Sequence, residues 1–410
     1  MDPVTNSIMA MVDAWEPAPI EFFLFKVTPQ VRIANETAYK PERFSIGPYH
    51  YGKGSMDNQK CRYIWQLLRR KKEHNVNNYV VAMRKLVDKA RHCYAEPISL
   101  ETDSFLKMIV IDGLFIAELF LKNEMRNLID EFDPIFKDKW VRVTLERDLL
   151  LYENQIPLFV IKKLFKMILV PTKQFKFIDL ALKFFRLGRN QESTFGNSIN
   201  DVEHLLGLVH MNICPSFLRM EHNSQNWKSI PCATQLREAR VKFTTTLERN
   251  MFDIRFSNGV MEIPTLSIDD QIECQLRNLM AYEQYGHDNH PKYVTDYVIF
   301  IFHLIRSPMD VELLRRKGIL ENWVGDDEAV SSMFNKLGHF ITLSDESFFY
   351  SEVFNNVNKY CSRRRNVWMA KLERNYLSSP WAMVSILAAT ILLLLTIIQT
   401  IFSILSYTSA

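Results

Sequence analysis

The stretch "DSFLKMIVIDGLFIAELF", Asp103 to Phe120, carries the apolar pattern that best indicates the class of fold. A spacing of three and four residues places side chains on one face of an α-helix. Asp103 can serve as the N-cap, because its carboxylate can accept a hydrogen bond from a free backbone N–H group of the first turn. The segment therefore predicts an apolar helix. The apolar residues with this spacing are Phe105, Met108, Ile109, Ile116, Leu119 and Phe120.

Two further segments have helical patterns. "RDLLLYENQIPLFVIKKLFKMILVP", from Arg147 to Pro171, starts as a very apolar helix, and Pro157 predicts a kink or a new helix start because it lacks a backbone donor. Asp269 or Asp270 can cap a third helix. The apolar side of that helix is formed by Ile272, Leu276, Leu279 and Met280. The fold is therefore predicted to be mostly α, with one large helical globular domain.

One segment has the alternation of a β-strand instead. In "FDIRFSNGVMEIP", Phe252, Ile254 and Phe256 alternate with polar residues. Asn258 and Gly259 supply the two positive φ angles of a tight turn, and a second extended run follows. The sequence predicts a small β-hairpin within the helical domain.

Composition limits the function without assigning it. The chain has 410 residues, 47% of them hydrophobic, with a net charge of +3. This is the composition of a packed globular protein, and so small a charge does not suggest a nucleic-acid partner. The six cysteines form no C-x-x-C pair, so reduced thiols are a simpler interpretation than a disulfide scaffold or a zinc ribbon.

The carboxyl-terminal segment "WAMVSILAATILLLLTIIQTIFSILSY" has 27 residues and no charge. A helix of this length covers ~40 Å, compared with ~30 Å of bilayer hydrocarbon. Leu392, Leu393, Leu394 and Leu395 lie in its middle. Trp381 and Tyr407 stand at its ends, where interfacial aromatic residues belong. Residues 381–407 are therefore predicted to be a transmembrane helix in contact with membrane lipid.

The sequence also predicts a topology. The first 20 residues, expected to be flexible, do not form a signal peptide, and only three residues follow the apolar run. Five basic residues precede it and no charged residue follows, which favours a cytosolic location for the family domain, residues 21–378. A polar stretch, 187–203, could divide this domain. The sequence leaves open which membrane is used. The basic residues are Arg363, Arg364, Arg365, Lys371 and Arg374.

The segment "FSIGPYHYGKGS", residues 44–55, has the spacing of a phosphate-binding loop at Gly47, Gly52 and Lys53. In such a loop the lysine is followed directly by Ser or Thr, but here Gly54 follows. Pro48 also lacks a donor where backbone N–H groups should surround the phosphate. The sequence therefore predicts no nucleotide binding. "MIVID", ending at Asp112, would suit a strand with a metal-holding aspartate, but it lies within the predicted helix.

Other chemical motifs are weak. The sequence contains no G-x-S-x-G and no H-E-x-x-H motif. His287 and His290 could share a metal, but they lack a third ligand, so no metal and no cofactor is predicted. Glu153 lies in an apolar stretch. A partly buried carboxylate of this kind usually accepts hydrogen bonds from capping groups or pairs with a nearby arginine. The alternative is a raised pKa and an enzyme that uses Glu153 with His50 or His204.

Several stretches carry a family resemblance, among them "SIGPYH", "MIVIDGLFIAELF", "YENQIPLFV", "SIPCATQLREARVKF" and "FDIRFSNGVMEIPTLSID". In this order they resemble the plant-specific "domain of unknown function 247" family, also called UPF0481, from about Phe22 to the carboxyl terminus. Arg240 stands where relatives commonly have glycine. The most distinctive positions are Ser45, Gly47, Pro48, Tyr49 and His50 in the first motif and Glu153, Asn154, Gln155 and Pro157 in the second.

The resemblance implies a membrane-associated plant protein with no assigned catalytic residues. Some grass members are male determinants of self-incompatibility, and one sequence does not place this chain among them. Together with the predicted anchor, this favours a module for protein interaction, recognition or signalling with an unknown protein partner. The enzyme described above and a purely structural membrane tether are the alternatives.

Overall fold

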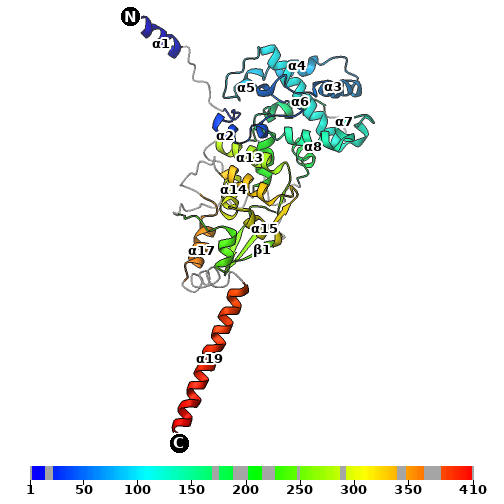
Figure 1. Ribbon diagram of the computed structural model, residues 1–410. Helices are drawn as coiled ribbons and strands as arrows, with labels where there is room; N and C mark the ends of the chain where they lie inside the picture. The colour runs from blue at the N-terminus through cyan, green and yellow to red at the C-terminus, as the bar shows by residue number, and fades with distance from the viewer. Residues whose placement is uncertain are drawn as a thin grey trace. The chain divides into compact units, whose positions relative to one another are not determined.

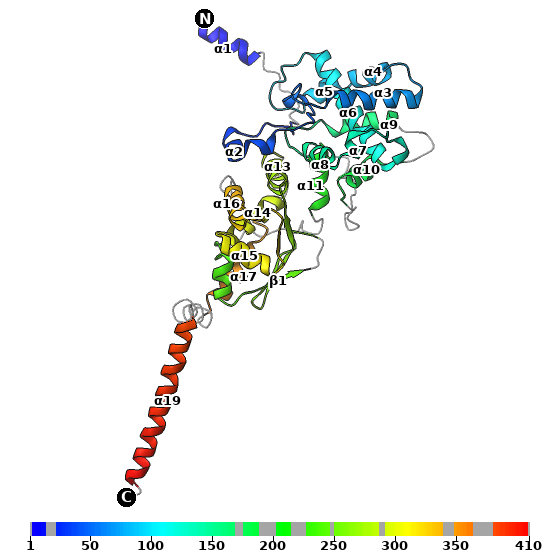
Figure 2. The same cartoon turned by 45° about the vertical axis from the view of Figure 1, so that its right-hand side comes forward.

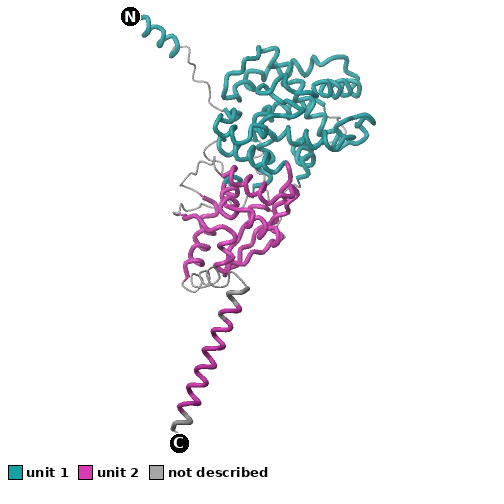
Figure 3. The backbone as a smooth tube through the Cα atoms, viewed as in Figure 1, with its two compact units in different colours: residues 1–220, 271–295 teal, residues 221–270, 296–410 magenta. Residues whose placement is uncertain are grey.

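The computed structural model describes residues 2–13, 22–168, 175–187, 202–214, 227–246, 250–286, 292–338, 348–363 and 380–408. The chain forms two compact units (Figure 3). Unit 1 comprises Met1–Met220 and Gln271–Thr295, and unit 2 comprises Glu221–Asp270 and Asp296–Ala410. The chain passes between units after residues 220, 270 and 295. Most of the stretch 187–203, where a division was predicted, lies outside the described residues.

Unit 1 is built from helices in its described part (Figure 1). The first, α1, lies in the amino-terminal stretch that was expected to be flexible, and its side chains from Pro3 to Val12 are exposed. The helices are α1 (Pro3–Asp13), α2 (Pro29–Ala34), η1 (Glu36–Tyr39), η2 (Pro48–His50), α3 (Asp57–Lys71), α4 (Asn77–Arg84), α5 (Val87–Arg91), α6 (Thr102–Glu124), η3 (Arg126–Leu128), α7 (Pro134–Lys137), α8 (Lys139–Asp148), α9 (Leu158–Ile168), α10 (Phe177–Phe184), α11 (Leu205–Ile213) and α13 (Ile272–Tyr285).

The helix α6 is the centre of the unit 1 core and confirms the helix predicted from the apolar spacing. It is buried along most of its length, and α3, α4, α9 and α10 pack around it (Figure 2). Gly113 lets α9 approach closely, because a Cβ atom there would lie 2.5 Å from Leu164 Cδ1. The predicted cap is wrong: Glu101 is the N-cap residue, and Asp103 lies in the first turn.

The helix predicted from Arg147 onward is wrong for residues 149–157, but the new helix start predicted at Pro157 is confirmed. The helix α8 ends at Asp148, residues 149–157 are not helical, and α9 begins at Leu158, directly after Pro157. The side-chain amides of Asn154 and Gln155 donate to the backbone carbonyls of residues 148, 149 and 151. These bonds satisfy the carbonyls that a continuing helix would have used.

The start of α13 is a smaller correction. The helix begins at Ile272 with Gln271 as its N-cap residue, so neither Asp269 nor Asp270 caps it. The apolar side predicted for this helix is confirmed in part, because Leu276 and Leu279 are buried.

Unit 2 combines helices with short strands. The helix α14 starts in unit 1 and continues into unit 2. The elements are α12 (Ala233–Glu238), β1 (Lys242–Thr246), β2 (Arg255–Ser257), β3 (Val260–Pro264), β4 (Leu266–Ile268), α14 (Tyr293–Leu304), α15 (Pro308–Arg316), β5 (Leu320–Asn322), α16 (Asp327–Gly338), α17 (Ser351–Cys361) and α19 (Pro380–Thr408).

The predicted hairpin is confirmed. Strands β2 and β3 are antiparallel, and between them Asn258 and Gly259 have φ angles of 51° and 81°. Strand β2 begins only at Arg255, so Phe252 and Ile254 precede it. The sequence did not predict β1, which pairs with β3 in parallel to complete a three-stranded sheet, or the parallel pair of β4 and β5.

The helix α12 ends in a Schellman motif with an unusual residue. Val241 N–H donates to Leu236 O and Arg240 N–H donates to Arg237 O, each at 2.9 Å. Arg240 has a φ of 65°, a left-handed conformation that glycine usually supplies. The arginine noted in the sequence therefore occupies a position where glycine would be favoured.

The helix α19 confirms a long apolar carboxyl-terminal helix that includes Trp381 and Tyr407. Its segment Leu387–Ile404 has a mean hydropathy of 2.3 and is long and apolar enough to cross a membrane. The side chains of this segment are exposed, including those of Leu392, Leu393, Leu394 and Leu395.

Candidate functional site

The motif from Ser45 to His50 forms a tight turn into the short helix η2. Gly47 precedes that helix with a φ of 75°. A Cβ atom at Gly47 would lie 2.3 Å from Gln155 O, so the position needs glycine for both its backbone angle and its space. The motif is therefore a packed structural turn.

The second motif packs directly on this turn through Asn154. Its side-chain oxygen accepts a hydrogen bond from Ile46 N–H at 2.6 Å, and its nitrogen donates to Phe44 O at 2.9 Å. Gln155 lies beside it, and its backbone oxygen accepts a bond from Tyr94 Oη at 3.0 Å. The two motifs thus form one buried polar network.

Asp112 closes the network from the helix α6. Its carboxylate accepts from Gly47 N–H at 2.9 Å and pairs with Lys60 Nζ at 2.7 Å. Lys60 also donates to Ser45 O at 2.5 Å. Burial raises the pKa of Asp112, although Lys60 opposes the shift. This aspartate is already occupied by a lysine and a backbone N–H group, which are the contacts of a structural residue.

Glu153 is held by groups from the amino-terminal part of unit 1. It accepts from Val27 N–H at 2.6 Å, forms an ion pair with Arg32, and lies 3.5 Å from His50 Nε2. Burial would raise its pKa, but His50 and Arg32 lower that pKa below 4.5. The structure thus supports the paired acid and contradicts a raised pKa for Glu153.

His50 and His204 have different surroundings. His50 is buried beside Glu153, which brings together one of the two pairs considered for an enzyme. His204 lies instead among the rings of Phe23, Tyr152 and Tyr282. Its Nδ1 accepts a bond from Gly207 N–H at 3.2 Å and caps α11, and burial lowers its pKa to about 3.

Two positions of the motifs remain. Pro157 directly precedes α9, and Tyr49 is held by hydrogen bonds. Tyr49 Oη donates to Leu24 O at 2.9 Å and to the Glu96 carboxylate. Burial and Glu96 raise the pKa of Tyr49. These contacts fasten the segment around Leu24 to the turn, so the motif residues hold unit 1 together.

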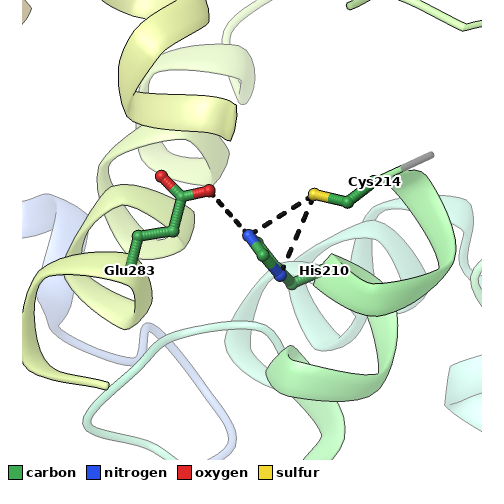
Figure 4. Close-up of side chains that lie close together, drawn as sticks. All are labelled: His210, Cys214 and Glu283. Atoms are coloured by element: carbon green, nitrogen blue, oxygen red, sulfur yellow. Dashed lines mark hydrogen bonds and ion pairs between the residues drawn. The ribbon is translucent and has the colours of Figure 1, made fainter. Parts of the chain in front are cut away.

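A second cluster in unit 1 brings together a histidine, a cysteine and a glutamate, which are residue types found at catalytic and metal sites. His210 and Cys214 lie one turn apart at the end of α11, and Glu283 faces them from α13 (Figure 4). His210 Nε2 lies 2.7 Å from Glu283 Oε1 and 3.5 Å from Cys214 Sγ. His210 and Glu283 are buried, and Cys214 is partly buried.

The electrostatics of this cluster follow from the buried carboxylate. Burial would lower the pKa of His210, but Cys214 and Glu283 raise it to about 10. Burial raises the pKa of the Cys214 thiol, so at neutral pH the thiol keeps its proton. The cluster therefore places a His210–Glu283 pair beside a protonated thiol.

This cluster was not predicted from the sequence. The signal for half of it is present, because "HMNIC" places His210 and Cys214 at i and i+4 on one helix face. Glu283 follows 73 residues after His210, and no local pattern connects the two. His287 and His290, which were considered as metal ligands, lie outside the described residues.

Most of the chain, including both motifs, matches a known protein family. Residues 24–395 match the family model DUF247, described as a plant protein of unknown function. The chain belongs to this family. The resemblance found in the sequence is thereby confirmed over nearly the whole chain, and the two buried motifs of this DUF247 protein lie within the matched residues.

Two relatives of this DUF247 protein come from Arabidopsis thaliana. A UPF0481 protein is 30% identical over 418 residues, with 94% of this chain and 86% of the relative covered. A putative UPF0481 protein is 22% identical over 498 residues, with 97% and 93% covered. No solved structure matches.

Proposed function

We propose that this DUF247 protein is anchored in a membrane by α19 and binds another protein through its helical part. The segment Leu387–Ile404 supports the anchor, since lipid would cover its exposed apolar side chains. At 1.5 Å per residue the whole of α19 covers ~43 Å, enough to cross the hydrocarbon with tilt.

Exposed aromatic side chains are the observation that carries the proposed protein partner. Trp65, Phe132 and Trp140 in unit 1 are 55%, 67% and 65% exposed. Large aromatic residues are enriched among the residues that contribute most to binding at protein interfaces. The three lie on neighbouring parts of the chain. Arg62 of α3 donates to Phe132 O at 3.1 Å, Lys137 of α7 lies over the Phe132 ring, and α7 packs against α8, which carries Trp140.

Cations accompany these aromatic residues. The Arg69 guanidinium lies 4.7 Å from the centre of the Trp65 ring, and Lys137 Nζ lies 5.3 Å from that of Phe132. Aromatic rings with neighbouring cations suit a partner that presents both apolar and acidic side chains. The partner of this surface is therefore proposed to be an acidic protein segment with apolar residues.

The orientation proposed for the anchor is the one expected from the sequence, with residues 1–378 in the cytosol. Protease added outside sealed microsomes should digest this part, and detergent should not be needed. Protection of the domain, or glycosylation of Asn35 in "NET", would contradict this orientation. A fragment ending at Ser379 should be soluble and should not enter the membrane fraction.

The proposed partner is tested by proximity labelling in intact plant cells. The full chain should label a reproducible set of proteins, and the triple variant W65A/F132A/W140A should lose most of it. Trp323→Ala is the matched control, because this tryptophan is 75% exposed in unit 2. If the triple variant labels the same proteins as the unchanged chain, this surface is not the binding surface.

A further inference from the structure

We propose that His210, Cys214 and Glu283 bind a divalent metal ion of the zinc type. One ligand atom from each residue lies within 4.8 Å of the other two. Imidazole nitrogen, thiolate sulfur and carboxylate oxygen together form a donor set that suits zinc. All three residues belong to unit 1: His210 lies in α11, Cys214 is the C-cap residue of that helix, and Glu283 lies in α13.

The distance between His210 Nε2 and Cys214 Sγ equals the one expected between two ligands of a tetrahedral ion. With zinc bonds of about 2.3 Å to sulfur and about 2.05 Å to nitrogen, these two ligand atoms lie about 3.5 Å apart. Cys214 Sγ lies 3.5 Å from His210 Nε2 and 3.9 Å from His210 Nδ1, so the thiol lies beside the imidazole ring and must turn toward the Nε2 side to bind the ion. The 2.7 Å between His210 Nε2 and Glu283 Oε1 is a hydrogen-bond distance and must open to about 3.4 Å.

Glu283 can replace one of its hydrogen bonds with a bond to the metal ion and keep the others. Oε1 accepts from Val294 N–H at 2.8 Å and from His210, and Oε2 accepts from the N–H and hydroxyl of Thr295 at 2.7 Å and 2.6 Å. A carboxylate offers about four acceptor positions, and these four contacts fill them. The ion would replace only the His210 contact, so the three bonds to the start of α14 remain.

Binding of the metal ion releases two protons from the protein. The ion takes the position of the His210 Nε2 proton and of the Cys214 thiol proton, and both protons pass to solvent. Three protein ligands leave a fourth position for water. The bound ion would join residues 205–214 to residues 283–295, two parts of unit 1 that the chain connects only through unit 2.

Cobalt substitution tests the site in the full-length protein in detergent. After removal of metal with a chelator, Co²⁺ should bind at one equivalent and produce the near-ultraviolet charge-transfer absorbance of a thiolate ligand. Cys214→Ser should abolish this absorbance. Cys232→Ser should retain it, because Cys232 is equally partly buried but belongs to unit 2.

A thermal measurement separates loss of the metal from loss of the fold. Without metal, Cys214→Ser should melt within a few degrees of the unchanged protein, since the thiol makes only weak contacts. Zn²⁺ should raise the melting temperature of the unchanged protein and of Cys232→Ser, but not that of Cys214→Ser. The proposal is wrong if saturating Co²⁺ gives no thiolate absorbance, or if the absorbance survives in Cys214→Ser.

Discussion

Asn154 joins the two sequence motifs by accepting from Ile46 N–H at 2.6 Å while donating to Phe44 O at 2.9 Å. The same amide donates to Asp148 O at 2.7 Å. One side chain thus satisfies three buried backbone groups from segments about a hundred residues apart. An amide is required here, because only an amide offers an acceptor and two donors at once.

Asn154→Asp should therefore destabilise unit 1 by about 3 kcal/mol or more. The substitution keeps the acceptor for Ile46 but replaces both donors with an oxygen that faces two carbonyl groups. Urea unfolding of the fragment 1–379 measures the change. Asn78→Asp, at an exposed position in the first turn of α4, should change the free energy of unfolding by less than about 0.5 kcal/mol.

Glu153→Gln should flatten the loss of stability at acid pH. The pKa of Glu153 is lowered in the folded protein, so its contribution is present above the ordinary value of 4.5 and is lost as the pH falls through the folded value. Unfolding measured from pH 6 to pH 3 should thus show a shallower decline for the variant. Glu131→Gln, at an exposed position, should leave the slope unchanged.

Arg240→Gly should stabilise unit 2 by about 1 kcal/mol. The arginine pays the cost of a left-handed φ, and its side chain is exposed, so glycine removes strain without removing packing. Arg237→Gly is the matched control within α12 and should destabilise by about 1 kcal/mol. A decrease in stability for Arg240→Gly would contradict the assignment of this turn.

Lys122→Met should destabilise unit 1 by about 3–5 kcal/mol, because it leaves the buried carboxylate of Asp133 without the cation that pairs with it. Lys122 and Asp133 are fully buried and 3.0 Å apart. The double variant K122M/D133N should recover part of the loss, since it removes both charges. The exposed Lys139→Met should have little effect on unfolding by urea.

The sequence predicted the features that depend on local spacing. The apolar interval identified α6, and the Asn258-Gly259 pair identified the hairpin, because a helix face and a tight turn are determined by nearby residues. The apolar run of α19 was recognised for the same reason. These elements would be found in the chain without knowledge of its tertiary contacts.

Other features depend on distant contacts and could not be read locally. Residues 149–151 are all leucine and suggest a helix, yet amides four and six residues further on take up the backbone carbonyls. Strand β1 gains its partner β3 only through folding. Glu283 reaches His210 across 73 residues, so the candidate metal cluster appears only in three dimensions.

The order in which the chain leaves and re-enters unit 1 has a consequence for its synthesis. Asn278 of α13 accepts from Tyr152 N–H at 2.8 Å and donates to Ala38 O at 2.8 Å. These two early residues therefore form their hydrogen bonds only after residue 278 has been synthesised. At 5–20 residues per second, the ribosome needs several seconds to make the intervening residues 153–277. During that interval the nascent chain exposes the surface that α13 will cover, and a ribosome that stalls before residue 278 holds a chain whose core is incomplete.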